Sequence, residues 1–381
     1  MIKELDKRKR IAIITSGHLP YDERIFWKFG KTLSEKFDVC IISSKENINT
    51  VNDNIQIIGF IDLNKPKAKI EQFLIHLSDF NPELVFCAQP LTILAAIQFK
   101  KKNKKVKIVY DVTEWYPENI TTKLIGLRRI FNYIILFLLN ILTSNLCDWI
   151  VVGESVKKRR YKIIAPLKHS TIIGYYPVLK FFNYTPPLIA NDKIVLCYAG
   201  VITIERGIIQ LFEVAKALAV KRPGLFVSII IAGKFTYEEE EIKFKRLIAH
   251  QDNVNITFKH WTDYDKVYFL IKDADICFDL RKLNFIYKNS LPIKLFEYMA
   301  CGKPFIYSDI SAIRNEIGDI SCGFLVNPDN VDEIVDRITD YIDNKSMLKS
   351  HSLEGRKIIE NGKNWETESN KLLSLVDTLL K

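Results

Sequence analysis

Short apolar runs alternate with helical segments along nearly the whole chain, and this alternation is the feature that most limits its possible folds. The runs at 10–16, 84–87 and 194–200 are almost wholly apolar, as is typical of central strands in a parallel sheet. Between such runs, apolar residues recur at helical spacing, for example at 68–77 and 208–220. This alternation predicts βαβ units, and therefore an α/β fold built on doubly wound parallel sheets.

The remaining elements follow from the same two periodicities. Further strands are predicted at 39–43, 55–61, 106–110, 149–152, 226–233, 254–258, 276–278, 305–307 and 323–326. Further helices are predicted at 25–33, 130–142, 312–317, 330–343, 346–360 and 364–380. Residues 174–192 contain several prolines and little periodicity, which indicates a linker. We therefore expect a first Rossmann-like domain over 1–173, a second over 193–363 and a separate C-terminal helix over 364–381.

The net charge of +10 is concentrated in the first half of the chain. Residues 1–173 hold 28 Lys and Arg against 17 Asp and Glu, whereas residues 174–381 are close to neutral. Such a half is attracted to anionic surfaces, usually membranes or nucleic acids; a lysine-rich solvated surface is the alternative. Interleaved aromatic residues and recognisable nucleic-acid motifs are missing, so no nucleic-acid partner is expected.

The cysteines and the N-terminus indicate a cytoplasmic location. The seven cysteines are scattered, mostly in apolar runs, without a C-x-x-C motif, which favours reduced, buried thiols over disulfides or a zinc site. Residues 1–10 are charged and lead directly into a strand, so they are not expected to be a signal peptide. The D-x-D pattern at 273–275 precedes an apolar run, and we expect it to begin a strand rather than bind a metal.

The stretch 289–304 carries the most specific local pattern. Ser290 is predicted to cap a helix whose first turn holds Pro292 and which Gly302 ends. The free N–H groups and positive dipole end of such a helix bind phosphate. Glu297, further along the helix, is placed to reach the ribose of a nucleotide; a buried helix with one carboxylate at its edge is the alternative.

This stretch resembles the retaining, two-Rossmann-domain (GT-B) glycosyltransferases of family 4. In that family a Glu-x7-Glu pair handles the donor sugar and the ribose. Glu297 matches the second Glu, whereas Asn289 replaces the first and is expected to hydrogen-bond sugar hydroxyls without a charge. Ser290 and Leu291 lie between them and are expected to bind the donor. The resemblance implies two domains that face each other across a cleft, a last helix that crosses back to the first domain, and no metal or other cofactor.

A strand, loop and helix at 194–220 resemble the donor phosphate loop of this family. The matching residues are Gly200, Arg206 and Gly207, and Arg206 is expected to clamp the diphosphate. Val201 stands where the family often has Arg, so Lys234, after the next strand, is the candidate for a second cation; surface-exposed basic residues are the alternative. In the family the loop around Trp261 lies near the nucleobase.

Two loops of the first domain resemble the acceptor side of the family's site. The first is Gly17-His18-x3-Asp22, after the first strand; a histidine that caps the strand is the alternative. The second follows the strand at 106–110 and contains Asp111, Thr113 and Glu114. Thr113 replaces a family histidine that lines the catalytic pocket. Glu114 and His18 are expected to act in catalysis with Asn289 and Glu297; alternatively, the carboxylates only cap the next segment.

The most apolar stretch, 130–142, is thirteen residues long and contains two Asn. It is shorter than the roughly 20 residues that span a bilayer. It is therefore expected to be either an ordinary core helix or a helix lying in a membrane interface, with Arg128 and Arg129 near lipid phosphates.

The resemblance implies a metal-independent glycosyltransferase that transfers a sugar to an acceptor hydroxyl with retention. The donor is expected to be a UDP- or GDP-linked sugar, and the acceptor a saccharide or lipid-linked saccharide used in capsule or O-antigen assembly. The protein is expected in the cytoplasm, peripheral on an anionic membrane surface. Because Asn289 and Thr113 depart from the family, an inactive nucleotide-sugar-binding partner of another transferase is one alternative, and an inverting transferase or epimerase of the same architecture is another.

Overall fold

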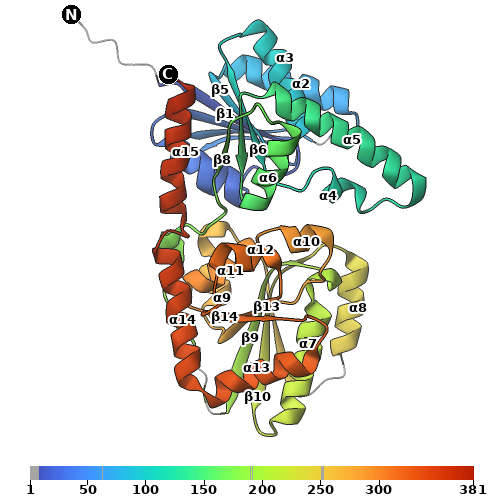
Figure 1. Ribbon diagram of the computed structural model, residues 1–381, viewed down its shortest axis with the longest axis vertical. Coiled ribbons are helices and arrows are strands. Elements are labelled where there is room, and N and C mark those ends of the chain that lie inside the picture. The colour runs from blue at the N-terminus through green and yellow to red at the C-terminus, as the bar shows by residue number, and fades with distance from the viewer. Residues whose placement is uncertain (1–7, 62, 189, 191, 250–252) are drawn as a thin grey trace, which may run out of the picture. The chain divides into compact units, whose positions relative to one another are not determined.

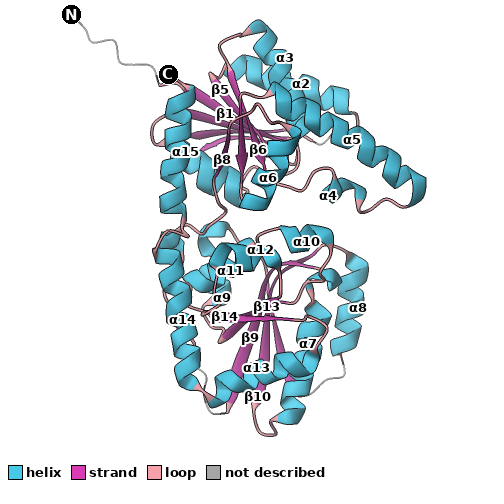
Figure 2. Cartoon of the chain, viewed as in Figure 1, coloured by secondary structure: helices cyan, strands magenta, loops and turns pink. Residues whose placement is uncertain are grey.

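The computed structural model describes residues 8–61, 63–188, 190, 192–249 and 253–381. The chain forms two compact units (Figure 1). The first runs to Tyr175 and also includes Thr367–Lys381, and the second is Tyr176–Glu366. Helices lie on both sides of the sheet in each unit (Figure 2).

The first unit contains an eight-stranded sheet in the order β3-β4-β2-β1-β5-β6-β7-β8. Its strands are β1 (Arg10–Thr15), β2 (Asp38–Ser43), β3 (Ile48–Asn52), β4 (Ile55–Gly59), β5 (Leu84–Cys87), β6 (Lys107–Val112), β7 (Trp149–Val152) and β8 (Ser170–Ile172). Every pairing is parallel except that of β3 with β4. The sequence did not predict β3, because this edge strand is mostly polar and partly exposed.

Two groups of helices cover this sheet. The helices α2 (Pro66–Phe80), α3 (Pro90–Lys102), α5 (Gly126–Leu146) and α6 (Ser155–Ile164) pack against one another in that order. The π-helix η1 (Glu23–Gly30) continues into α1 (Lys31–Ser34), and both contact β2. A short helix, α4 (Glu118–Thr121), contacts α5. Apolar side chains of the strands, α2 and α3 form the core of this unit.

Helix α5 differs from its prediction in length and burial. The helix has 21 residues, from Gly126 to Leu146, instead of the thirteen predicted. The residues on either side of the apolar stretch, several of them polar, are helical as well. Only Asn140, Thr143 and Ser144 are buried, so the core-helix interpretation is wrong. It is the one helix of the described residues that is long and apolar enough to cross a membrane.

The second unit contains a six-stranded, wholly parallel sheet in the order β11-β10-β9-β12-β13-β14. Its strands are β9 (Lys193–Ile202), β10 (Phe226–Phe235), β11 (Val254–Lys259), β12 (Ile276–Asp279), β13 (Phe305–Ser308) and β14 (Gly323–Val326). The helices α7 (Ile208–Lys221) and α13 (Val331–Asp343) pack together against the main core. Helix α11 (Ile293–Ala300) packs against β13 and α14 (Lys345–Glu360).

The shorter elements complete the chain. They are the helices α8 (Glu238–Ile248), α9 (Tyr268–Ile271), α10 (Phe285–Asn289) and α12 (Ser311–Ile317), and the single 3-10 turns η2 (Leu179–Phe181), η3 (Ile204–Arg206) and η4 (Tyr264–Lys266). The last helix, α15 (Trp365–Leu379), begins in the second unit and joins the first from Thr367 onward. Its Glu368 accepts a 2.8 Å hydrogen bond from the backbone N–H of Gly174. The predicted return of the last helix to the first domain is confirmed.

Candidate functional site

The strand order in the sheet of the second unit changes direction between β9 and β12. The chain leaves β9 toward β10 on one side, whereas β12 is followed by β13 on the other. In open α/β sheets, ligands bind at the carboxyl ends of the strands at such a point. The loops that follow the two strands are joined there, because the N–H of Lys282 donates a 2.8 Å hydrogen bond to the carbonyl oxygen of Glu205.

Gly207 makes this approach of the two loops possible. Its φ of 81° lies in the left-handed region, and a Cβ at this position would lie 2.2 Å from the carbonyl oxygen of Leu280. Only glycine relieves both constraints. Gly207 ends η3 and directly precedes α7, so the first N–H groups of a 14-residue helix begin at this loop, as in an anion-binding helix terminus.

Arg206 lies in this loop with its guanidinium group 5.9 Å from the centre of the Tyr287 ring. Within the described residues, no carboxylate forms an ion pair with it. Arg281 lies 5.1 Å from the same ring but is held by Asp279 through two hydrogen bonds. Two guanidinium groups therefore share one aromatic ring, and only one of them has a carboxylate partner.

The surroundings keep Arg206 charged. Burial lowers its pKa, as does the nearby positive charge of Arg281, but Tyr198 and Asp279 more than compensate and raise the pKa above its ordinary value. The Tyr198 hydroxyl donates a hydrogen bond to the carbonyl oxygen of Val201. A permanently charged, half-buried cation without a carboxylate partner is suited to bind an anion such as a diphosphate.

Lys234 and Gly200 lie near the same strand ends. Lys234 is exposed on β10 and pairs in register with Val201 on β9. A Cβ on Gly200 would lie 3.8 Å from the Cγ atom of Lys294, so the start of α11 passes over the end of β9. The hydroxyl of Tyr298 fixes this approach, because it bonds both the N–H and the carbonyl oxygen of Ala199.

The segment before α11 differs from its prediction. Asn289 is the last residue of α10, and its side-chain amide donates to the carbonyl oxygen of Phe285 at 2.8 Å. Ser290 donates to the carbonyl oxygen of Ile286 at 2.7 Å. Ser290 therefore does not cap α11, and Pro292 occupies the cap position. The reason is that an unpredicted short helix precedes the site and takes the hydroxyl; Leu291, which follows, is buried.

Glu297 is completely buried and forms an ion pair with Lys294, one turn earlier in α11. The Nζ atom lies 3.0 and 2.8 Å from the two carboxylate oxygens, and 4.5 Å from the centre of the Trp261 ring. Lys294 therefore connects the predicted ribose ligand to the predicted nucleobase loop. Lys294 was not among the predicted site residues, although its i, i+3 spacing to Glu297 is visible in the sequence.

Lys294→Met is expected to lower the free energy of unfolding by about 3 kcal/mol, because it leaves a buried carboxylate without its lysine. Donor binding is expected to weaken as well. The double variant Lys294→Met/Glu297→Leu replaces the pair by apolar groups, and should recover stability but not donor binding. Chemical denaturation and donor titration measure the two effects. Wild-type stability of Lys294→Met would show that the pair is unimportant.

In the first unit, three loops at the carboxyl ends of β1, β5 and β6 meet. The imidazole of His18 bonds Asp22 through Nδ1 at 3.3 Å and Thr113 through Nε2 at 3.1 Å. Gln89, which follows β5, accepts a 2.7 Å hydrogen bond from the N–H of Ser16. A Cβ on Gly17 would lie 2.7 Å from Nε2 of Gln89. The structure thus brings together the predicted residues Gly17, His18, Asp22 and Thr113. It adds Gln89, which reaches this loop because β1 and β5 are adjacent strands.

Acidic neighbours raise the pKa of His18 above its ordinary value. Burial lowers this pKa, but the hydrogen bond and charge of Asp22, together with the charges of Glu114 and Asp111, outweigh burial. The stability contributed by the protonated pair is therefore fully present below the pKa of the unfolded chain, about 6.5. It is lost as the pH rises through the higher pKa of the folded state.

Asp22→Asn is expected to lower the pKa of His18 and to flatten this loss of stability with rising pH. Asparagine can still accept the backbone hydrogen bonds of Arg24 and Ile25 that Asp22 accepts, so the cap of η1 is retained. NMR titration of the imidazole protons gives the pKa directly. His76, whose pKa burial lowers, is the internal control. An unchanged His18 titration would contradict the expectation.

Asp111 and Glu114 have different surroundings. Asp111 is buried and bonds the guanidinium group of Arg24 through both oxygens, at 2.6 and 2.7 Å. Its carboxylate is therefore committed to an ion pair inside the first unit. Glu114 is exposed and is the carboxylate of this loop that solvent and a ligand can reach.

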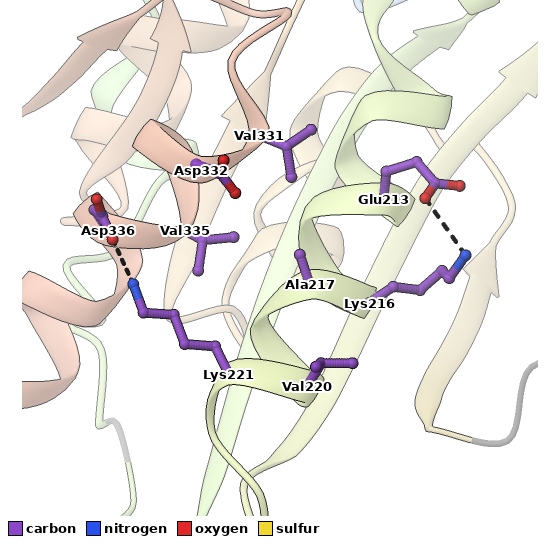
Figure 3. A pocket seen from close by; sticks show the side chains of 9 residues that line it. All are labelled: Glu213, Lys216, Ala217, Val220, Lys221, Val331, Asp332, Val335 and Asp336. Atoms are coloured by element: carbon purple, nitrogen blue, oxygen red, sulfur yellow. Dashed lines mark hydrogen bonds and ion pairs between the residues drawn. The ribbon is translucent and has the colours of Figure 1, made fainter.

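A surface groove of about 640 Å³ lies elsewhere in the second unit, between α7 and α13 (Figure 3). Its lining includes the ion pairs Glu213–Lys216 and Lys221–Asp336. None of the predicted donor residues line it, and we assign it no role.

Comparison with known proteins gives a family match that covers most of the second unit. A model of the family described as "Glycosyl transferases group 1" matches residues 183–365. No curated protein matches the sequence.

Solved structures match the chain over nearly its full length. Sucrose-phosphate synthase from Thermosynechococcus elongatus has a TM-score of 0.76 at 15% identity, over 98% of this chain and 99% of its own. HepE from Anabaena, in complex with UDP-glucose, has a TM-score of 0.71 at 11% identity, over 97% and 99%. A glycosyltransferase from Rickettsia africae has a TM-score of 0.70 at 15% identity, over 98% and 99%. At these identities the likeness establishes a shared fold.

Proposed function

We propose a retaining sugar transfer for this chain, which belongs to the glycosyl transferases group 1 family through residues 183–365 and has the GT-B fold. It is a nucleotide-sugar-dependent glycosyltransferase. Family and fold do not specify the donor contacts, the stereochemistry of transfer or the acceptor, and these are what we propose. The transferred group is one sugar, and it passes to a hydroxyl group of a saccharide.

One observation carries the assignment of the donor site. Arg206 is half-buried at the switch point of the second sheet, is charged, and has no carboxylate partner among the described residues. The amino end of α7 begins one residue after Gly207. A cation and a helix amino end in one loop are what a diphosphate requires.

The remaining donor contacts follow from the positions of three residues. Glu297 is proposed to accept hydrogen bonds from the ribose hydroxyls, as the family resemblance implies. Asn289 contacts the sugar hydroxyls, and Lys234 supports Arg206 as a second cation. Negative charge grows on the nucleotide as the bond to the sugar breaks, and fixed cations there lower the barrier.

Retention is proposed to proceed by attack on the same face of the sugar, assisted by the departing phosphate, as the family resemblance implies. In this mechanism no enzyme carboxylate forms a bond to the sugar. Glu114 and His18 act on the acceptor side, where His18 is fixed by Asp22 and Thr113. Isolation of a covalent sugar–enzyme adduct would contradict this mechanism.

The donor is proposed to carry UDP. The HepE structures are described as complexes with UDP and with UDP-glucose, and the similar trehalose-6-phosphate protein from E. coli as bound with UDP-2-fluoro glucose. These ligands belong to those proteins, and they make UDP-sugars the first donors to test here.

The acceptor is proposed to be a lipid-linked saccharide of surface-polysaccharide assembly, at the cytoplasmic face of an anionic membrane. Two observations support this: the positive charge of the first half of the chain and the exposed apolar side chains of α5. Both properties favour a peripheral enzyme over one that uses only soluble acceptors.

A donor screen tests the proposed function. Purified protein is titrated with UDP-, GDP-, ADP- and TDP-sugars, with and without EDTA, and the same series is repeated on Glu297→Ala. Metal-independent binding of one donor, weakened by the substitution, supports the proposal. Failure to bind any donor would overturn it. Donor binding without transfer to any acceptor would favour the alternative of an inactive partner, for which the replacements Asn289 and Thr113 are the motivating features.

A further inference from the structure

The outer face of α5 is apolar along its whole length. Ile125, just before the helix, and Leu127, in its first turn, are 88% and 85% exposed. The stripe continues at helical spacing with the exposed side chains Ile130, Phe131, Ile134, Ile135, Leu138, Leu142 and Leu146. Single exposed apolar residues are ordinary, but a continuous stripe of this length marks an interaction surface.

The three fully buried residues of α5, Asn140, Thr143 and Ser144, are all polar, whereas a surface helix usually buries apolar residues. The side chain of Asn140 is fully buried and donates to Tyr161 of α6 at 3.2 Å. It accepts from Tyr110 of β6 at 3.3 Å. Near the end of the helix, Asn145 donates to the carbonyl oxygen of Ile164 at 2.8 Å. Hydrogen bonds therefore hold this helix to its unit, and its exposed apolar side chains remain available to contact a partner or a membrane.

The charges of α5 indicate what the exposed apolar side chains contact. Helix α5 contains two basic residues, Arg128 and Arg129, and no acidic residue. Both arginines are exposed at the amino end of the stripe. A lipid surface with anionic headgroups satisfies both properties, because its acyl chains accept the apolar side chains and its phosphates pair with the arginines.

The hydrogen bonds of the inner face also decide how the helix meets the lipid. Its length and composition are compatible with a membrane span. A span, however, would expose Asn140 to hydrocarbon and break its bonds to Tyr110 and Tyr161, which is costly. In Figure 1 α5 runs beside α3 and beyond it toward α4, so one side of the helix stays attached to the unit.

We propose that the outer face of α5 lies in the plane of an anionic membrane, with its apolar stripe in the headgroup and acyl boundary and Arg128 and Arg129 on lipid phosphates. The purpose of this membrane contact, which is to bring the enzyme to a lipid-linked acceptor, rests on the proposed function. Membrane binding itself is measured without donor or acceptor.

Co-sedimentation of the full-length protein with vesicles tests the binding. Vesicles of phosphatidylcholine with phosphatidylglycerol should bind the wild type, and Phe131→Glu/Leu138→Glu should weaken binding at least about tenfold. Leu167→Glu changes an exposed leucine of the same unit outside α5, and should leave binding unchanged. Arg128→Gln/Arg129→Gln should weaken binding by about fivefold for each arginine on the anionic vesicles, with little effect on pure phosphatidylcholine.

Depth measurements separate an in-plane helix from a span. Tryptophan is introduced at Leu127, Leu138 or Leu146 in turn, and its quenching by brominated lipids is compared with the wild type. An in-plane helix gives similar, shallow depths for all three positions, whereas a graded depth would overturn the proposed orientation. Unchanged vesicle binding of Phe131→Glu/Leu138→Glu would overturn the surface itself. So would a dimer that forms through this face without lipid and does not bind vesicles.

Failure of this inference can be distinguished from failure of the proposed function. Hydrolysis and binding of the nucleotide sugar depend on the second unit, and Phe131→Glu/Leu138→Glu should leave both unchanged in solution. Loss of vesicle binding with intact donor binding therefore concerns α5 alone. Vesicle binding by a protein that binds no donor would support the membrane surface and overturn the proposed function.

Discussion

Arg206→Gln is expected to lower kcat/KM for the nucleotide sugar by about 10²–10³-fold, the usual cost of removing one group that stabilises developing negative charge. Most of this loss should fall on kcat, because the charge of the diphosphate grows toward the transition state. Stability should change little, since Arg206 has no carboxylate partner among the described residues and its removal relieves repulsion from Arg281. Steady-state kinetics with the donor found in the screen measures the effect.

Arg246→Gln is the matched control for Arg206→Gln. It removes the same charge from α8 of the same unit, where the side chain is exposed, and should leave kcat/KM within about twofold of the wild type. If Arg206→Gln behaved like this control, the diphosphate would have to bind elsewhere, and Lys234 and Arg281 would become the candidates. An equal loss in both variants would indicate only a dependence on net charge.

Asp111→Ala is expected to lower the free energy of unfolding by about 3–5 kcal/mol, because it leaves the guanidinium group of Arg24 buried without its carboxylate. Both side chains are only 3% exposed. Arg24 also stacks on Tyr175, with the guanidinium carbon 4.1 Å from the ring centre. A guanidinium group does not lose its proton in proteins, so Arg24 cannot escape this cost by becoming neutral. Denaturant unfolding measures the change.

The double variant Arg24→Met/Asp111→Leu separates a structural role from an acceptor role. If Asp111 serves the ion pair alone, apolar side chains of similar size should recover most of the stability, and acceptor KM should remain near that of the wild type. If Asp111 binds the acceptor, the double variant should be stable but have a raised acceptor KM. Retained stability in Asp111→Ala would show that the ion pair contributes little.

The sequence was most informative where a strong local preference agrees with the fold. The strands β5, β7 and β14 begin and end at the predicted residues, because short apolar runs of this length have few alternatives to a strand of a parallel sheet. Arg206 and Gly207 were predicted to bind the donor because their short loop resembles the donor phosphate loop of the family, and this role stays a prediction. The polar edge strand β3 was missed because its sequence lacks such a preference.

Contacts between distant residues could not be predicted in the same way. Asp111 appeared equally suited to an acceptor or to a cap, and only the fold brings Arg24 to it. Ser290 appeared to be a helix cap until the structure placed α10 directly before it. Gln89 accepts the hydrogen bond of the Ser16 N–H because β1 and β5 are neighbours in the sheet.

The sequence by itself determined the class of fold and the uneven distribution of charge. These depend on residues close together in the chain, where periodicity and backbone sterics act directly. Tertiary structure alone decided which of the apolar and polar residues of α5 face outward. The amphipathic pattern of a helix defines two faces but does not say which one packs inward. Here buried hydrogen bonds from Tyr110 to Asn140 and from Asn140 to Tyr161 hold a polar side chain inward.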